Sequence, residues 1–131
     1  MIQANELRIG NLVLSNNPLY RKDWLGKVLS VLEIKDESVS VVAIDELPYA
    51  FTGGQFLKYI DPIPLTEEIL LKCGFSSPIN GWYTSPNKTL EFGFNGEGKL
   101  ILMDWFLEIT SLHQLQNLYF ALTNTELEIN L

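Results

Sequence analysis

The chain has 131 residues, 47% of them hydrophobic, and a formal net charge of −7, which is typical of one folded domain or of two small lobes. Seven Phe, three Trp and five Tyr supply apolar area for a core and argue against intrinsic disorder. No apolar run approaches the roughly 20 residues of a membrane span, and the first ten residues lack the basic and apolar regions of a signal peptide. We therefore expect a cytoplasmic protein in which the single Cys73 stays reduced.

The charge is unevenly distributed along the chain. Residues 1–65 carry eight acidic and six basic side chains, whereas residues 66–131 carry eight acidic and three basic ones. An acidic second half argues against broad phosphate binding there. Two interpretations stay open: the charge keeps the protein soluble, or it mimics nucleic acid for a host enzyme.

The first half of the chain predicts a small β-rich lobe over residues 1–64. Three runs that are rich in β-branched residues or alternate in polarity predict strands: 12–14, 26–34 and 38–44. The polar residues 35–37 predict a hairpin turn, Gly53-Gly54 are expected to break the next segment as a turn, and 56–60 to add a short strand. This order is typical of an SH3-like small β-barrel or of a curled antiparallel sheet, by analogy of fold alone.

The two prolines of "DPIPL" predict an extended connector, after which apolar residues follow a helical period. Thr66 is the expected N-cap of a short helix. Gly74 is its expected left-handed stop, which lets Phe75 fold back on Leu70.

A hairpin and a final helix are expected next. Three strands are predicted: around Trp82-Tyr83, at 88–94 and as one long run at 99–109. The glycine-rich residues 95–98 predict the hairpin turn. Ser111 and Gln114 have the spacing of a capping box at the start of the last helix, which ends at Thr123-Asn124.

The tail, residues 125–131, alternates in polarity and is expected to add a strand or to dock on the surface. Residues 65–131 then form an α-β-β-β-α unit. This half is either a second domain or part of one compact domain that shares a core with residues 1–64. Because the helices are few and segregated from the strands, the fold class is α+β.

The segment "SLHQLQNLYFAL", residues 111–122, carries no charged side chain. At about 100° per residue, one helix face is apolar and is the expected core side: Leu112, Leu115, Leu118, Tyr119 and Leu122. The opposite face holds an imidazole, two amides and a phenyl ring: His113, Gln116, Asn117 and Phe120. Because charges are costly to desolvate, this uncharged composition fits a contact surface. It packs either within the fold or on a partner, which is another protein or a second copy of the chain.

The inventory of reactive side chains predicts a non-enzymatic protein without metal or cofactor. One His and one Cys leave only carboxylates as metal ligands, and no calcium-binding, phosphate-binding or nucleophile motif is present. Cys73 and His113 are the one nucleophile pair to consider, but Cys73 lies on an apolar stripe, where an inert thiol is commoner. Carboxylates occur close together at Asp45-Glu46 and at Asp104 with Glu108, as is common on acidic surfaces. We assign none of them a catalytic role.

One basic patch with interleaved aromatic residues gives an alternative function, nucleic-acid binding. The patch consists of Tyr20, Arg21, Lys22, Trp24 and Lys27. Loops of small barrels use such residues to contact phosphates and to stack on bases. Asp23 within the patch and the negative net charge argue against this alternative, and a solvated loop explains the patch without any function.

Three segments resemble a known family. They are "ELRIGNLV", "DPIPLTEEILLKCGF" and "LHQLQNLYFALTNTELE". The chain resembles a family of small uncharacterised proteins of Bacteroides-type gut bacteria and of their phages and prophages. The resemblance implies an intracellular protein and points to a mobile element, but it carries over no activity and no site residues. Against this family, residues 15–25 look like a variable insertion, which further weakens the nucleic-acid alternative. The sequence therefore favours a protein-interaction module.

Overall fold

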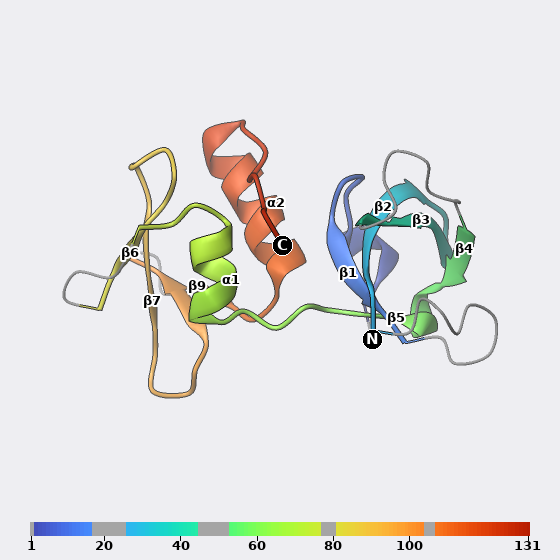
Figure 1. Cartoon of the computed structure of the whole chain (residues 1–131), viewed down its shortest axis with the longest axis horizontal. Coiled ribbons are helices and arrows are strands. Elements are labelled where there is room, and N and C mark those ends of the chain that lie inside the picture. The colour runs from blue at the N-terminus through green and yellow to red at the C-terminus, as the bar shows by residue number, and fades with distance from the viewer. Residues whose placement is uncertain (1, 17–25, 45–52, 77–80, 104–106) are drawn as a thin grey trace. The chain divides into compact units, whose positions relative to one another are not determined.

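The computed structural model of the chain describes residues 2–16, 26–44, 53–76, 81–103 and 107–131. They belong to two compact units, Met1–Ile63 (unit 1) and Pro64–Leu131 (unit 2), each with its own antiparallel sheet (Figure 1). The predicted mixture of helices and strands in an α+β fold is confirmed. None of the helices within the described ranges has the length and apolarity to cross a bilayer.

Unit 1 is built on one five-stranded sheet. Its elements are η1 (Ala4–Glu6), β1 (Leu12–Ser15), β2 (Val28–Ile34), β3 (Ser38–Ala43), β4 (Gly53–Phe56), η4 (Leu57–Tyr59) and β5 (Ile60–Asp61). The strand order is β4-β3-β2-β1-β5, and every neighbouring pair is antiparallel. The two edge strands are joined by η4 alone, and a 3₁₀ turn advances only about 2 Å per residue. The sheet must therefore curl so that its edges approach each other, which confirms the predicted curled sheet.

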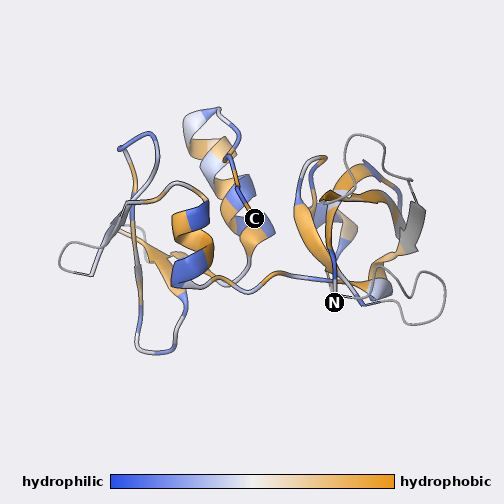
Figure 2. Ribbon diagram, viewed as in Figure 1, coloured by the Kyte–Doolittle hydropathy of each residue, from blue (hydrophilic) through white to orange (hydrophobic). Residues whose placement is uncertain are grey.

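The core of unit 1 follows from the two-residue period of its strands. Leu29 and Val31 in β2 and Val39 and Val41 in β3 are all buried, and together with buried residues of the other elements they form one apolar cluster. In Figure 2 these strands are largely orange, the colour of apolar residues. The register between β2 and β3 shifts after Val31, so that Leu32 is the extra residue of a bulge and is exposed.

Two predictions for the end of this sheet are wrong. Gly53 and Gly54 do not break the chain as a turn, because they pair with Val41 and Ser40 as part of β4. A strand ladder is made by backbone groups, so glycines can continue it, here at an edge. The strand predicted over 56–60 is replaced by η4 and the two residues of β5.

The described residues of unit 2 form two helices and a four-stranded meander. Its elements are α1 (Glu67–Lys72), β6 (Tyr83–Thr84), β7 (Glu91–Phe94), β8 (Leu100–Leu102), β9 (Leu107–Ile109) and α2 (Leu112–Thr123). The strand order is β6-β7-β8-β9, antiparallel throughout. The predicted turn after β7 is confirmed, since the Asn95 side chain accepts hydrogen bonds from the amides of Glu97 and Lys99.

The long strand predicted over 99–109 is wrong. The chain reverses within this run, because Leu102 pairs with Leu107 and Leu100 with Ile109. Unit 2 is therefore α-β-β-β-β-α. Asp104 is the one turn-favouring residue type in this run, and a single aspartate in an otherwise largely apolar run does not distinguish one long strand from two short ones.

Both predicted ends of α1 are confirmed. The Thr66 hydroxyl oxygen accepts a hydrogen bond from the Ile69 amide at 3.2 Å. Gly74 has a φ of 84°, and the amides of Gly74 and Phe75 donate to the carbonyls of Leu71 and Leu70. This pair of bonds is a Schellman motif, which satisfies the last carbonyls of the helix and turns Phe75 back toward it.

The start of α2 differs from the predicted capping box. Ser111 is the N-cap, but its side chain caps no amide. The side-chain oxygen Oε1 of Gln114 instead accepts a hydrogen bond from the backbone amide of Thr110, one residue before the N-cap, at 2.9 Å. At the other end the tail docks on α1 and adds no strand: the Asn130 amide donates to the Lys72 carbonyl at 3.0 Å, and Leu127 is buried.

Candidate functional site

A groove of about 500 Å³ opens on unit 1, where the turn between β2 and β3 meets η4. Described residues that line it are Gln3, Asp36, Glu37, Phe56, Leu57 and Lys58. The pairing of β3 with β4 ends at Ser38 opposite Phe56, and the Leu57 amide then donates to the Glu37 carbonyl at 3.0 Å. This bond fixes the turn against η4. We call this feature the unit 1 groove.

Phe56 is the exposed aromatic side chain among the described lining of the unit 1 groove, and the partly exposed Tyr59 lies beside it. Phe56 is 58% exposed, whereas its neighbour Leu57 is buried in the core. The Phe56 and Tyr59 rings lie 6.4 Å apart with a tilt of 58°. The Lys58 ammonium lies 5.1 Å from the Tyr59 centroid and 5.9 Å from the Phe56 centroid, within cation–π range of both rings. The two rings thus form an open cage around one cation.

The rim of the unit 1 groove carries opposed charges. Asp36 and Glu37 are both exposed, and Lys58 supplies one positive charge. Gln3 also lines the groove, and its backbone amide donates to the Glu6 carboxylate at 2.6 Å, which holds the start of η1. The described side chains of the groove therefore combine two carboxylates, one ammonium and an exposed phenyl ring. That combination can bind a ligand through charge and aromatic contact.

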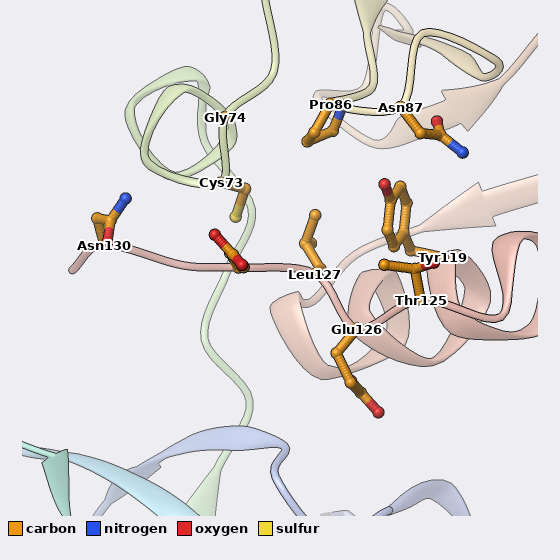
Figure 3. A pocket seen from close by; sticks show the side chains of 10 residues that line it. Cys73, Gly74, Pro86, Asn87, Tyr119, Thr125, Glu126, Leu127 and Asn130 are labelled. Carbon is orange, nitrogen blue, oxygen red and sulfur yellow. The ribbon is translucent and has the colours of Figure 1, made fainter.

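A second pocket, of about 330 Å³, lies in unit 2 beneath the C-terminal tail (Figure 3). Figure 3 shows Leu127 pointing into it between Cys73 and Tyr119. Burial raises the pKa of the Cys73 thiol to about 12. The thiol is therefore protonated at neutral pH and is not an activated nucleophile. The pair of Cys73 and His113 thus lacks the thiolate that this chemistry needs.

The α2 face predicted to bind a partner is buried at its N-terminal end and partly exposed toward its C-terminal end. His113 and Gln116, in the first half of the helix, are 1% and 4% exposed. Asn117 and Phe120 are partly exposed. A partner could reach only the second half of this face in the present conformation, and partner binding there stays a prediction.

The apolar face of α2 is shorter than predicted. Leu112, Leu115 and Tyr119 are buried, as expected for a core side. Leu118 is only partly buried and Leu122 is 43% exposed, so Tyr119 is the one residue of this face that is buried in the second half of the helix.

Most of the predicted nucleic-acid patch lies outside the described residues, namely Tyr20, Arg21, Lys22 and Trp24. Lys27 immediately precedes β2, and its carbonyl accepts from the Ser15 amide at 3.0 Å. Nucleic-acid binding by this patch therefore stays a prediction.

Most of the carboxylates singled out in the sequence also fall outside the described residues, namely Asp45, Glu46 and Asp104. Glu108 is described, and its carboxylate lies 3.0 Å from the Lys99 ammonium. The pKa of Lys99 is raised, first by this hydrogen bond and then by the charges of Glu108 and Glu97. Glu108 therefore belongs to a surface ion pair.

Within the ranges that the structure describes, no three His, Cys, Asp or Glu side chains gather as a metal site. Comparisons with protein-family models, with curated proteins and with solved structures give no match to this chain. The assignment of a site therefore depends on the geometry alone.

The unit 1 groove was not predicted from the sequence. Glu37 and Phe56 are distant in the chain and meet only through the pairing of β3 with β4. The one local signal is the run "FLKY", residues 56–59, in which a lysine stands between two aromatic residues. Such a run does not tell which ring faces water, so it could not have been assigned without the sheet.

Proposed function

We propose that the chain is a non-enzymatic protein-interaction module whose binding surface is the unit 1 groove, and that its occupant is an extended segment of a partner protein. The observation that carries the proposal is the exposure of Phe56 beside a rim of charged side chains. Large aromatic residues with a polar rim are the usual centre of a protein interface, because the ring loses water on binding while the rim stays solvated.

The form of the groove favours a segment of a protein over a small molecule. Small-molecule pockets enclose most of the ligand and are lined mainly by apolar groups. In the unit 1 groove, the charged side chains Asp36, Glu37 and Lys58 are all exposed, and so is Phe56. An occupant would be covered on one side only, as an extended segment is when it crosses a groove.

The groove also favours a protein over nucleic acid. Two carboxylates at its rim would repel a phosphate backbone, and Lys58 is the one basic side chain among the lining residues that the structure describes. Lys27, the one described residue of the predicted nucleic-acid patch, is not among the described residues that line this groove.

We further propose that unit 1 is an SH3-like small barrel. Its strand order, β5-β1-β2-β3-β4, and the single 3₁₀ turn between β4 and β5 support this assignment. The assignment concerns the fold only, since one fold serves many functions.

The proposed function is tested by selecting peptides from a random displayed library against the full chain. Selected peptides are then titrated against the wild type, Phe56→Ala and the matched control Ile9→Ala. Ile9 is 65% exposed and lies outside the groove, so its loss removes apolar surface without touching the site. We expect Phe56→Ala to weaken binding by about tenfold or more, as for an interface hot spot, and Ile9→Ala to have little effect.

Two results would overturn this proposal. One is that no selected peptide depends on Phe56. The other is that light scattering shows a dimer that Phe56→Ala dissociates, in which case the occupant of the groove is a second copy of the chain.

A further inference from the structure

We infer that the segment bound in the unit 1 groove carries an arginine or lysine, and that this residue displaces Lys58 from the Phe56 and Tyr59 rings. The inference rests on the proposed function. It adds the chemistry of the partner and the role of Lys58, which competes with the partner's cation for the two rings. In the free protein Lys58 occupies the position that the partner's cation takes in the complex.

The first step is the geometry of the rings. Two rings 6.4 Å apart and tilted by 58° hold one ammonium at 5.1 and 5.9 Å from their centroids. Attraction of a cation by a ring quadrupole does not depend on which chain supplies the cation. The same cage therefore suits a basic side chain of a partner.

The second step is the charge. Without Lys58, the described lining of the groove has two carboxylates, Asp36 and Glu37, and no positive charge. An incoming cation that replaced Lys58 would then be attracted both by the two rings and by the two carboxylates. An arginine fits best, since its planar guanidinium stacks on a ring and donates to a carboxylate at the same time.

The third step is the movement of Lys58, which must leave the rings before the partner's cation can replace it. Lys58 is exposed and lies on the three-residue η4, whose backbone is held by the bond from Leu57 to Glu37 and by the buried Leu57 side chain. The four-carbon stem of Lys58 can thus leave the rings while the backbone stays in place. The groove opens by a side-chain movement alone.

The experiment uses synthetic peptides of alternating valine with arginine, with citrulline or with glutamate as probes. Citrulline has the shape of arginine without its charge. Each peptide is titrated against the wild type, Lys58→Met, the double variant Asp36→Asn/Glu37→Gln and the control Asp61→Asn, with backbone amide shifts as the readout. Asp61 is an exposed carboxylate of the same sheet that lies outside the groove.

We expect the arginine peptide to shift the amides of Glu37, Leu57 and Lys58, and the other two peptides to leave them unchanged. Lys58→Met should tighten arginine-peptide binding by about threefold to tenfold, because it removes the competing cation and keeps an apolar stem. The double variant should weaken binding by about tenfold, and Asp61→Asn by less than about twofold. Whether Lys58→Met tightens or weakens binding of the arginine peptide is the decisive result. If Lys58 instead contacted acidic groups of the partner, its loss would weaken binding.

The inference fails if Lys58→Met weakens binding of the arginine peptide, if the citrulline peptide binds equally well, or if the arginine peptide leaves the groove amides unshifted. These failures differ from failure of the proposed function. Selected peptides that lack basic residues, depend on Phe56 and ignore the double variant would remove the inference and leave the interaction module standing.

Discussion

Units 1 and 2 place a pair of aromatic rings in opposite environments. In unit 2, Phe75 and Phe92 are both buried, with their rings 5.5 Å apart. In unit 1, Phe56 and Tyr59 lie 6.4 Å apart, and Phe56 faces water beside an ammonium group. The two contacts have similar geometry, so the ring contact itself does not decide whether the pair stabilises the fold or remains available to a ligand. The surroundings of the rings decide it.

The difference follows from the position of each ring in its sheet. Phe92 lies in β7, which has β6 on one side and β8 on the other, and Phe75 is turned toward the sheet by the end of α1. Phe56 is the last residue of β4, an edge strand, where the chain turns into η4. A ring at the end of an edge strand has fewer neighbours that can exclude water from it. We expect the following measurements to test this contrast.

The largest effect is expected from truncating one ring in each unit. Phe92→Ala should lower the free energy of unfolding of unit 2 by about 3–5 kcal/mol, because it leaves a cavity in a closed core. Phe56→Ala should cost less than about 1 kcal/mol, since its ring is mostly hydrated already. Calorimetric unfolding of both variants measures the two values. Equal losses would show that Phe56 belongs to a core, and the interaction surface would then have to be sought elsewhere.

A smaller effect is expected from pH, and it concerns the closed core of unit 2. The ordinary pKa of the thiol is 9.0, and burial raises the pKa of Cys73 to about 12. Between these values the unfolded chain binds fewer protons than the folded one. The contribution of Cys73 to the free energy of unfolding is therefore fully present below pH 9 and is lost as the pH rises. Cys73 by itself contributes a slope of at most about 1.4 kcal/mol per pH unit. Urea unfolding between pH 7 and 10.5 measures it.

Two further groups of unit 2 act in the same direction. The pKa of Tyr83 is raised by burial and by its hydrogen bond to Glu67, and that of Lys99 by its hydrogen bond to Glu108. Each keeps its proton longer in the folded state, so each adds to the loss at alkaline pH. Cys73→Ala is the matched variant, and its curve should be flatter above pH 9. An unchanged slope would mean that water reaches the thiol.

The sequence predicted those parts of the fold that depend on neighbouring residues. Thr66 caps α1, Gly74 ends it and Asn95 makes the β7–β8 turn, each through bonds that span only a few positions. Such features depend on local chemistry, which a sequence displays directly.

Predictions from the sequence were wrong where the structure of a segment depends on its pairing with distant parts of the chain. The run 99–109 folds back on itself because β9 finds a partner in β8, and Gly53-Gly54 join a strand because β3 offers its edge. The unit 1 groove is of this kind, since it needs the meeting of Glu37 and Phe56. Exposure of a ring is set by the whole sheet, so the sequence gives the aromatic residues of a site without saying which of them faces water.

The left-handed stop of α1 gives the next effect. Gly74→Ala should cost about 1–2 kcal/mol, because the φ of 84° places a side chain against the backbone. Gly96→Ala is the matched control, since an added methyl group there meets no atom within 4 Å and its backbone is not left-handed. Chemical denaturation of both variants tests this. If Gly74→Ala is neutral, the turn that directs Phe75 onto Phe92 does not hold the buried ring pair in place.

The smallest effect compares the two helix starts of unit 2. Thr66 and Ser111 are both N-caps with extended backbone, at φ and ψ of −134° and 166° and of −137° and 157°. Only the Thr66 hydroxyl accepts an amide hydrogen bond, so Thr66→Ala should cost about 1 kcal/mol. Ser111→Ala should cost less than about 0.5 kcal/mol, because its buried hydroxyl has no hydrogen-bond partner among the described residues and gains nothing from burial.

Gln114→Ala completes this comparison. Its amide oxygen holds the Thr110 amide, so its loss should resemble that of Thr66 and not that of Ser111. Urea unfolding of the three variants separates the cases. If Ser111→Ala caused the largest loss of stability, the Ser111 hydroxyl would be hydrogen-bonded in solution. The start of α2 would then be capped by its N-cap side chain, as α1 is. If the expected order holds, an extended backbone and a hydroxyl side chain do not suffice for an N-cap, and the stabilisation comes from the hydrogen bond that the side chain makes with an amide.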